Sequence, residues 1–272
     1  MKGLYQMKNE IVANNLTAGY GQGFHFENLN LIIPSGKITS LIGANGSGKS
    51  TILKTMSRLI QPTHGEVYID GTSIFHMNTR EVAKKLAILP QSATAPEGIS
   101  VEELVANGRF PHISGMRRLS VEDREIVHWA MEACNIEELS KREVDTLSGG
   151  QKQRAWIAMA LAQKTDILFL DEPTTYLDIS HQLDILQLLQ KLNQTQKVTI
   201  VIVLHDLNHA SMFSHHVVAI NNGEQLIEGT PAEIITEENL RCIFHVKATI
   251  LVHPSLGYTM CIPYAFDRDT ND

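Results

Sequence analysis

The chain has 272 residues, of which 43% are hydrophobic and 19% charged, enough for one large globular domain, or one with an inserted subdomain, without disulfides. A net charge of −7 and the lack of a basic run argue against a nucleic-acid binder. Three widely spaced cysteines, with no CxxC pair, suggest neither a disulfide framework nor a zinc ribbon, so we expect buried or free thiols in a reducing cytoplasm.

The N-terminal residues are polar and lack an apolar signal core. No stretch approaches the roughly 18 consecutive apolar residues that span a bilayer. We therefore expect a cytoplasmic protein that reaches a membrane, if at all, through a partner.

The first part of the chain favours β structure. Extended runs are predicted at 11–20, 26–33 and 37–42, the last as a buried strand. A glycine-rich turn follows, and a helix is predicted from Lys49 to about Leu59. The run 64–71 is typical of a short strand that ends in an Asp-Gly turn.

From about residue 92 to 147 the pattern favours helices. Ser100-x-x-Glu103 is a capping box, and Ser120-x-x-Asp123 resembles a second helix start. Gly108–Gly115 between them is predicted to be a loop. One apolar helix face is expected from the residues at i, i+3, i+4 and i+7, which are Val127, Ala130, Met131 and Cys134.

Alternating helices and strands then resume. Helices are predicted at 148–163 and 180–192, the second with Leu183, Leu186 and Leu189 facing inward, and strands at 166–170, 198–204 and 217–220. The strand 198–204 is apolar on both faces and belongs in the middle of a parallel sheet. Asn221-Asn-Gly223 indicates a hairpin, and 248–263 suggests a second one around Pro254–Gly257.

These patterns predict an α/β protein with a mainly parallel core and an antiparallel N-terminal sheet. We expect one domain over residues 9–246, with a helical subdomain at about 92–147 inserted into it, and a hairpin tail at 247–272.

The segment Gly43–Ser50 reads Gly-Ala-Asn-Gly-Ser-Gly-Lys-Ser and fits the pattern G-x-x-x-x-G-K-[ST]. It lies after a buried strand and before a helix, where loop N–H groups and the helix N-terminus form an anion site. Lys49 would bind β- and γ-phosphates, and the Ser50 hydroxyl would bind Mg²⁺. The residues predicted to contact nucleotide here are Gly43, Asn45, Gly46, Ser47, Gly48, Lys49, Ser50 and Thr51.

Two adjacent carboxylates, Asp171 and Glu172, follow the apolar run Ile167–Leu170. They are expected at the carboxyl edge of the sheet, where α/β proteins bind ligands. Asp171 is predicted to hold Mg²⁺, most simply through water, and Glu172 to polarise the attacking water. An ordinary acidic turn is the alternative, but two adjacent carboxylates need solvation or a cation.

A second anion site is predicted at Leu147-Ser-Gly-Gly-Gln151. Ser148 and the two glycines open a helix and would present a hydroxyl, backbone N–H groups and a helix dipole. The residues predicted to contact nucleotide here are Ser148, Gly149, Gly150 and Gln151.

Over about residues 9–240 the sequence resembles the ABC ATPase family, whose signature is LSGGQ. The resemblance implies a P-loop NTPase (RecA-like) core with a mainly parallel sheet, an antiparallel β subdomain and an inserted helical subdomain. It also implies a head-to-tail homodimer with two ATP molecules between the subunits, in which each signature serves the partner's ATP.

Four further positions match this family. The resemblance implies that Tyr20 stacks on adenine, although Tyr20 alone could be a surface turn residue. It implies that Gln91 senses Mg²⁺ and the γ-phosphate, that Asp178 lies in a loop crossing the dimer interface, and that His205 senses the γ-phosphate. The predicted catalytic set is thus Lys49, Gln91, Glu172 and His205, and the predicted metal set is Ser50, Gln91 and Asp171, for hydrolysis of MgATP.

Histidines 205 and 209 are four residues apart, a spacing that can ligate zinc. The HExxH glutamate is absent, since Asp206, Leu207 and Asn208 lie between them. We expect no zinc site, and we expect His209, His215 and His216 at the surface.

Within the family, a transport role is favoured because only about 55 residues, without heptads, separate Gln91 from Ser148, too few for the coiled coil of repair ATPases. The resemblance is closest to ATPases of iron(III)-siderophore importers, and the expected cargo is a hydroxamate such as ferrichrome. Vitamin B12 and haem importers, or a non-transport ABC ATPase, are alternatives. Gly108–His112, Trp156–Gln163 and Asp171–Ile179 carry it. It implies two permease subunits docking near residues 92–118, an extracytoplasmic binding protein, and a peripheral location on the cytoplasmic membrane face.

Overall fold

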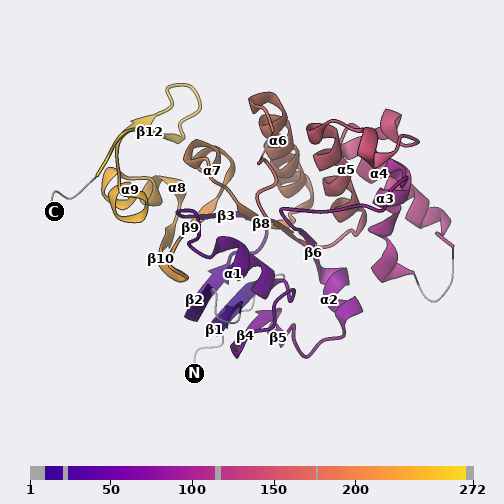
Figure 1. The fold of residues 1–272 in the computed structure, drawn as a ribbon, viewed down its shortest axis with the longest axis horizontal. Helices are drawn as coiled ribbons and strands as arrows, with labels where there is room; N and C mark the ends of the chain where they lie inside the picture. The colour runs from indigo at the N-terminus through magenta and orange to yellow at the C-terminus, as the bar shows by residue number, and fades with distance from the viewer. Residues whose placement is uncertain (1–9, 21–23, 114–117, 176, 268–272) are drawn as a thin grey trace. The chain divides into compact units, whose positions relative to one another are not determined.

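The computed structural model describes residues 10–20, 24–113, 118–175 and 177–267. The chain forms two compact units. The first comprises Met1–His76 and Val201–Asp272, and the second comprises Met77–Ile200. In Figure 1 the first unit is drawn in indigo and in orange to yellow. No helix in the described ranges is both long and apolar enough to cross a membrane.

The first unit contains the expected antiparallel sheet. Its strands are β1 (Ile11–Gly19), β2 (His25–Ile33), β4 (His64–Ile69) and β5 (Thr72–Ser73), in the order β2-β1-β4-β5. Ile11 pairs with Ile33 on one side and with Ile69 on the other. All three isoleucines are buried, so this end of the sheet belongs to the core.

Parallel strands of the same unit lead to the glycine-rich loop. β3 (Ile38–Ile42) pairs in parallel with β9 (His216–Asn221), and all five β3 residues are buried. β9 and β10 (Glu224–Gly229) form the predicted hairpin. Helix α1 (Lys49–Met56) ends before the predicted Leu59, because the chain turns at Ser57 and Arg58 has a left-handed φ of 66°.

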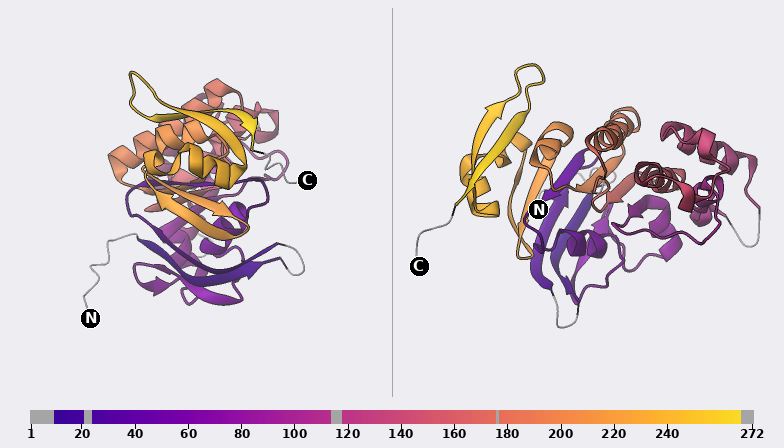
Figure 2. Two further views of the ribbon diagram at one scale, coloured as in Figure 1. Left: turned by 90° about the vertical axis from the view of Figure 1, so that its left-hand side faces the viewer. Right: turned by 45° about the horizontal axis from the view of Figure 1, so that its top comes forward.

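The end of the chain also belongs to the first unit. It has three short helices that the sequence analysis missed, α7 (Leu207–Phe213), α8 (Pro231–Ile234) and α9 (Glu237–Phe244). β11 (Val246–Val252) and β12 (Thr259–Phe266) form the predicted C-terminal hairpin. Figure 2 shows this hairpin in yellow, with β11 packed against α9.

Strand β8 (Thr199–Val203) starts in the second unit and ends in the first. It lies next to β3 in the order β10-β9-β3-β8, and next to β7 (Ile167–Leu170) in the order β8-β7-β6. β6 (Leu86–Leu89) pairs with β7 in parallel. Every β8 residue is buried, which confirms the prediction of a central strand.

Helices make up most of the second unit: α2 (Thr79–Lys85), α3 (Val101–Asn107), α4 (Val121–Ala133), α5 (Gly149–Ala162) and α6 (Ile179–Gln196). The predicted capping boxes at Ser100 and Ser120 are both formed. The predicted apolar face of α4 is confirmed, since Val127, Ala130, Met131 and Cys134 are buried. The sequence analysis missed α2 and β6.

Two details of this unit differ from the predictions. The loop Gly108–Gly115 contains a 3-10 turn at Phe110–His112, and its residues 114 and 115 lie outside the described part. In α6, Leu186 and Leu189 are buried as predicted, but Leu183 is only partly buried. The second unit is wider than the predicted insertion at 92–147, and the domain limits of the sequence analysis stay predictions.

Candidate nucleotide site

The loop between β3 and α1 requires glycine at two positions. Gly43 has a φ of 148°, and a Cβ there would lie 2.1 Å from the Ile220 carbonyl oxygen. Gly48 has a φ of 101° and caps α1, and its Cβ would lie 2.2 Å from the Phe24 ring. Side chains at either position would therefore push the loop off its two supports.

Lys49 is the central cation of this loop, and its side chain is largely buried. Its Nζ donates to the carbonyl oxygens of Gly43 (2.9 Å) and Ala44 (2.8 Å) and to Ser47 Oγ (3.3 Å). The Gly223 N–H donates to the Ser47 carbonyl at 2.8 Å, which ties the loop to the β9–β10 turn. A buried ammonium beside the N-terminus of α1 is suited to bind an anion such as a phosphate.

The other predicted loop residues divide by exposure. Asn45 and Gly46 are exposed, Ser50 is half-buried, and Thr51 is buried. The exposed residues form the outer rim of the loop, and Ser50 begins the helix beside Lys49.

The first unit also carries Tyr20 and His205. Tyr20 follows β1, is 52% exposed, and its N–H donates to the Phe24 carbonyl at 3.0 Å. His205 is exposed and lies just beyond β8. The Leu204 N–H donates to the Leu41 carbonyl at 3.3 Å, so His205 and the glycine-rich loop follow neighbouring strands that end together.

The acidic pair lies in the second unit, at the end of β7. Asp171 is 1% exposed, and its N–H donates to the Leu89 carbonyl at 3.0 Å. Glu172 has a left-handed φ of 52°, which is uncommon for a residue other than glycine.

Gln91 and Glu172 contact each other, although they lie 81 positions apart in the chain. Gln91 Nε2 donates to Glu172 Oε2 at 2.6 Å, and Thr175 Oγ1 donates to the same oxygen at 3.1 Å. The sequence analysis did not predict this contact or the role of Thr175. Because both bonds orient one carboxylate oxygen, the Glu172 carboxylate has a defined direction.

The predicted metal ligands fit a hard cation. Asp171 offers a carboxylate, Ser50 a hydroxyl and Gln91 an amide oxygen, and the Gln91 bond to Glu172 uses only its nitrogen. Mg²⁺ prefers such oxygen donors, so this donor set suits Mg²⁺ better than a softer metal.

Ser148 begins α5 with a capping box. Its Oγ accepts the Gln151 N–H at 3.3 Å, and Gln151 Oε1 accepts the Ser148 N–H at 3.1 Å. The Gln151 side chain thus caps its own helix. The N–H groups of Gly149 and Gly150 belong to the first turn, which offers no intrahelical acceptors. The Ser148 hydroxyl keeps its proton to donate, so this helix start can bind an anion.

Asp178 caps α6 in the same unit. Its Oδ1 accepts bonds from the His181 N–H (2.9 Å), His181 Nδ1 (2.7 Å) and Ser180 Oγ (2.8 Å). The bond from the His181 backbone is the main reason that the pKa of Asp178 is lowered to about 2. Asp178 is therefore a fixed anion at neutral pH.

His181 connects two of the predicted site residues, and the sequence analysis missed it. A Cβ on Gly150 would lie 2.5 Å from His181 Cδ2, whereas a Cβ on Gly149 would meet nothing within 4 Å. The imidazole thus lies between Gly150 and Asp178. The spacing Asp178-x-x-His181, typical of a cap, could have indicated the bond between Asp178 and His181, but not the contact with Gly150.

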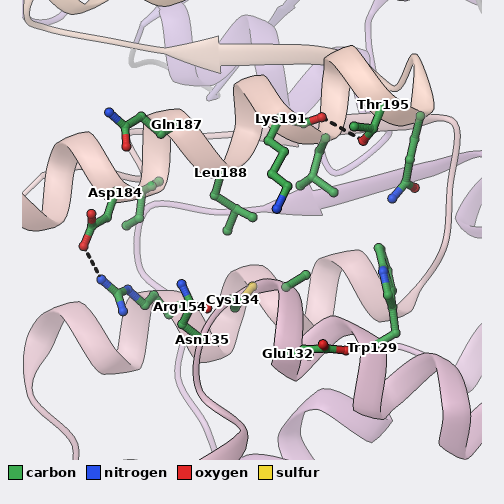
Figure 3. A pocket seen from close by; sticks show the side chains of 14 residues that line it. Trp129, Glu132, Cys134, Asn135, Arg154, Asp184, Gln187, Leu188, Lys191 and Thr195 are labelled. Atoms are coloured by element: carbon green, nitrogen blue, oxygen red, sulfur yellow. Dashed lines mark hydrogen bonds and ion pairs between the residues drawn. The ribbon is translucent and has the colours of Figure 1, made fainter.

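A cavity of about 610 Å³ lies elsewhere in the second unit, between α4, α5 and α6 (Figure 3). Its described lining includes Trp129, Cys134 and Lys191, but none of the predicted nucleotide residues. Arg154, on the signature helix, pairs with Asp184 at one side of it. This ion pair ties α5 to α6.

The expectation of surface histidines holds for only one of the three. His215 is exposed, but only 14% of the His209 side chain and 15% of the His216 side chain are accessible. Burial lowers the pKa of His216, whereas the Glu228 carboxylate, 3.7 Å from its Nε2, acts in the opposite direction.

Comparisons with known proteins identify relatives for nearly the whole chain. Residues 26–175 match the family described as ABC transporter. The chain is 52% identical to the iron(3+)-hydroxamate import ATP-binding protein FhuC of Bacillus subtilis (strain 168), over 94% of this chain and 95% of that protein. It is 49% identical to the ferric enterobactin transport ATP-binding protein FepC of Escherichia coli (strain K12), over 91% and 92%.

The fold also matches a solved ATP-binding cassette. The dimeric, post-hydrolysis structure of the cassette MJ0796 bound to ADP and Pi has a TM-score of 0.72 and 32% identity. The match covers 81% of this chain and 98% of the cassette chain.

Proposed function

Because this chain belongs to the ATP-binding subunits of the ABC transporter family, we propose that it energises the import of iron(III)-siderophore complexes, most specifically hydroxamates. It is an ATPase that converts ATP and water to ADP and phosphate. The cargo proposal rests on the 52% identity, across nearly the full chain, to a protein named for iron(3+)-hydroxamate import. Relatives named for petrobactin, enterobactin or achromobactin are less similar, at 42–49% identity.

The phosphates of ATP are bound, in this proposal, by the loop Gly43–Ser50 and the N-terminus of α1. Lys49 exchanges loop oxygens for oxygens of the β- and γ-phosphates, and Tyr20 stacks on the adenine. Ser50, Asp171 and Gln91 hold Mg²⁺, which neutralises phosphate charge when bound.

Glu172 acts on the attacking water, as a general base or by orienting it. The bonds from Gln91 and Thr175 support this role, because they fix the direction of the Glu172 carboxylate. His205 contacts the γ-phosphate and keeps the water in line.

We further propose a head-to-tail homodimer in which Ser148, Gly149 and Gly150 of one subunit contact the ATP of the other. Asp178 lies in the loop that crosses this interface. The dimeric state of the related cassette MJ0796 supports this arrangement. ATP then joins the subunits, and hydrolysis releases them.

The partners that complete the importer are two permease subunits and an extracytoplasmic binding protein. The permeases would dock near residues 92–118 and hold the ATPase at the cytoplasmic face of the membrane. Of this segment, residues 114–117 lie outside the described part of the chain.

Uptake of radiolabelled iron by a deletion strain tests the cargo. Ferrichrome, other hydroxamates, a catecholate siderophore and haem are supplied singly under iron starvation, and cobalamin uptake is followed in parallel. We expect hydroxamate uptake to collapse, and only the parental gene, not Glu172→Gln, to restore it. If uptake of the catecholate, haem or cobalamin is lost instead, the cargo assignment is wrong, but the assignment as an ATPase is unaffected.

A further inference from the structure

The side chain of Asn208, in helix α7, is hydrogen-bonded to the C-terminal hairpin. Asn208 Nδ2 donates to the Cys261 carbonyl oxygen at 3.2 Å, and the Cys261 N–H donates to Asn208 Oδ1 at 2.8 Å. The side-chain amide therefore pairs with both polar groups of one β12 residue, 53 positions away. This pairing fixes both the distance and the orientation of the strand relative to the helix.

An apolar cluster surrounds this pair of bonds. Its buried members are Ile235, Leu240, Ala248 and Cys261, and Leu207, Phe244, Val246 and Ile250 pack against it. Leu207 is the first residue of α7, and Ala248 and Ile250 belong to the hairpin. An isolated helix of seven residues is unstable in water, so α7 depends on such packing to hold its place.

His205 lies directly before α7. On one side of His205, Leu204 is bonded to β3; on the other, Asp206 caps α7 by accepting the His209 N–H at 2.9 Å. The Cys261 backbone is bonded to Asn208, three residues after His205, so β12 is anchored next to this junction. The hairpin therefore fixes the downstream side of the turn that presents His205.

We infer that the C-terminal hairpin positions His205 for ATP hydrolysis, with Asn208 as the positioning residue. The inference rests on the proposed function, in which His205 contacts the γ-phosphate. It gives the tail a role that its sequence does not indicate. Loosening the hairpin lets α7 and the His205 turn shift, while the loop that binds the phosphates keeps its own contacts.

Cys261 reports whether the hairpin is docked, because its side chain is 3% exposed. The full chain with Cys242→Ser lacks the exposed thiol, and Cys134 is buried with its pKa raised to about 12. In that background we expect maleimide at neutral pH to label the protein slowly. Asn208→Ala should raise the rate of Cys261 labelling by at least about tenfold, since it removes both bonds.

The same variants are then compared as ATPases. For Asn208→Ala we expect kcat to fall by about tenfold, the effect of roughly 1.4 kcal/mol of lost transition-state stabilisation, with KM for ATP unchanged. Asn30→Ala is the matched control, because its amide also accepts one backbone bond, from Asn15 (3.0 Å), and donates another, to Asn28 (2.9 Å). It should leave Cys261 labelling and kcat at parental values.

Two results overturn the inference. One is rapid labelling of Cys261 in Asn208→Ala with a parental kcat, which would make the hairpin irrelevant to hydrolysis. The other is unchanged labelling, which would mean that Asn208 does not hold the hairpin. His205→Ala is run in parallel: a parental kcat there refutes the proposed role of His205 itself, whatever Asn208 does. If Asn208→Ala does not fold, Asn208→Asp replaces it, because the carboxylate still accepts the Cys261 N–H and loses only the donated bond.

Discussion

The two adjacent glycines of the signature should respond oppositely to alanine. A Cβ at Gly149 meets nothing within 4 Å, so Gly149→Ala adds only helix propensity, a stabilisation of up to about 1 kcal/mol. A Cβ at Gly150 would lie 2.5 Å from the His181 ring and would force it to move. Overpacking of this kind costs about 1–3 kcal/mol, which outweighs the same gain in propensity.

The difference between the two variants isolates this clash, because both substitutions occur in the first turn of one helix. We expect the free energy of unfolding of Gly150→Ala to lie about 1–3 kcal/mol below that of Gly149→Ala. The displaced His181 also loses its 2.7 Å bond to Asp178, so the pKa of Asp178 should rise from about 2.

Urea unfolding followed by tryptophan fluorescence measures this difference. Both tryptophans of the chain, Trp129 and Trp156, lie in the second unit together with α5. Equal free energies for the two variants would refute the reasoning, since the His181 ring would then not occupy the space beside Gly150. The double variant Gly150→Ala/His181→Ala should recover most of the loss.

Three further outcomes are expected. Glu172→Gln should bind ATP but hydrolyse it about 10²–10⁴-fold more slowly, because the amide oxygen still accepts the bond from Gln91 but cannot act as a base. A parental rate of phosphate release would show that Glu172 takes no part in the chemistry. Lys49→Ala should abolish ATP binding measured by equilibrium dialysis, and retained affinity would contradict the phosphate assignment. The pKa of Asp123 is lowered from 3.8 to about 2, first by the Ser120 hydroxyl and also by the Arg109 guanidinium. Since the pKa of Asp123 is lower in the folded than in the unfolded chain, Asp123 stabilises the fold above about pH 4 and loses this effect as the pH falls toward 2. In urea titrations, the difference in free energy of unfolding between the parental chain and Asp123→Asn should therefore narrow from about pH 4 to about pH 2.

Local rules predicted those elements whose causes lie within a few residues of each other. The capping boxes at Ser100 and Ser120 and the turn at Asn221-Asn-Gly223 depend on near neighbours, and all three form as expected. The apolar strand that became β8 was also predictable, because a run buried on both faces has few other places to go. The short helices α7, α8 and α9 were missed, since fewer than nine residues give too few turns for a clear period.

The site shows the same limit. Sequence motifs placed Lys49, Glu172 and Ser148 at strand ends and helix starts, where the structure has them. Contacts between distant residues had no signal: neither the Gln91–Glu172 bond nor the packing of His181 on Gly150 follows from spacing. Both depend on how β6, β7 and the starts of α5 and α6 pack together, which is tertiary information.

The oxygens around Lys49 have a thermodynamic consequence for nucleotide binding. Folding has already removed most of the water from this ammonium and replaced it with two carbonyls and a hydroxyl of its own loop. When a phosphate binds, the Lys49 ammonium therefore exchanges one set of oxygen partners for another. The free-energy cost of dehydrating the ammonium has already been met in folding and does not weaken nucleotide binding. The loop is thus preorganised for an anion. When the phosphate binds, the carbonyl oxygens of Gly43 and Ala44 lose their bonds to Lys49 and need new donors. Nucleotide affinity therefore depends on how well the loop satisfies these two oxygens in the bound state.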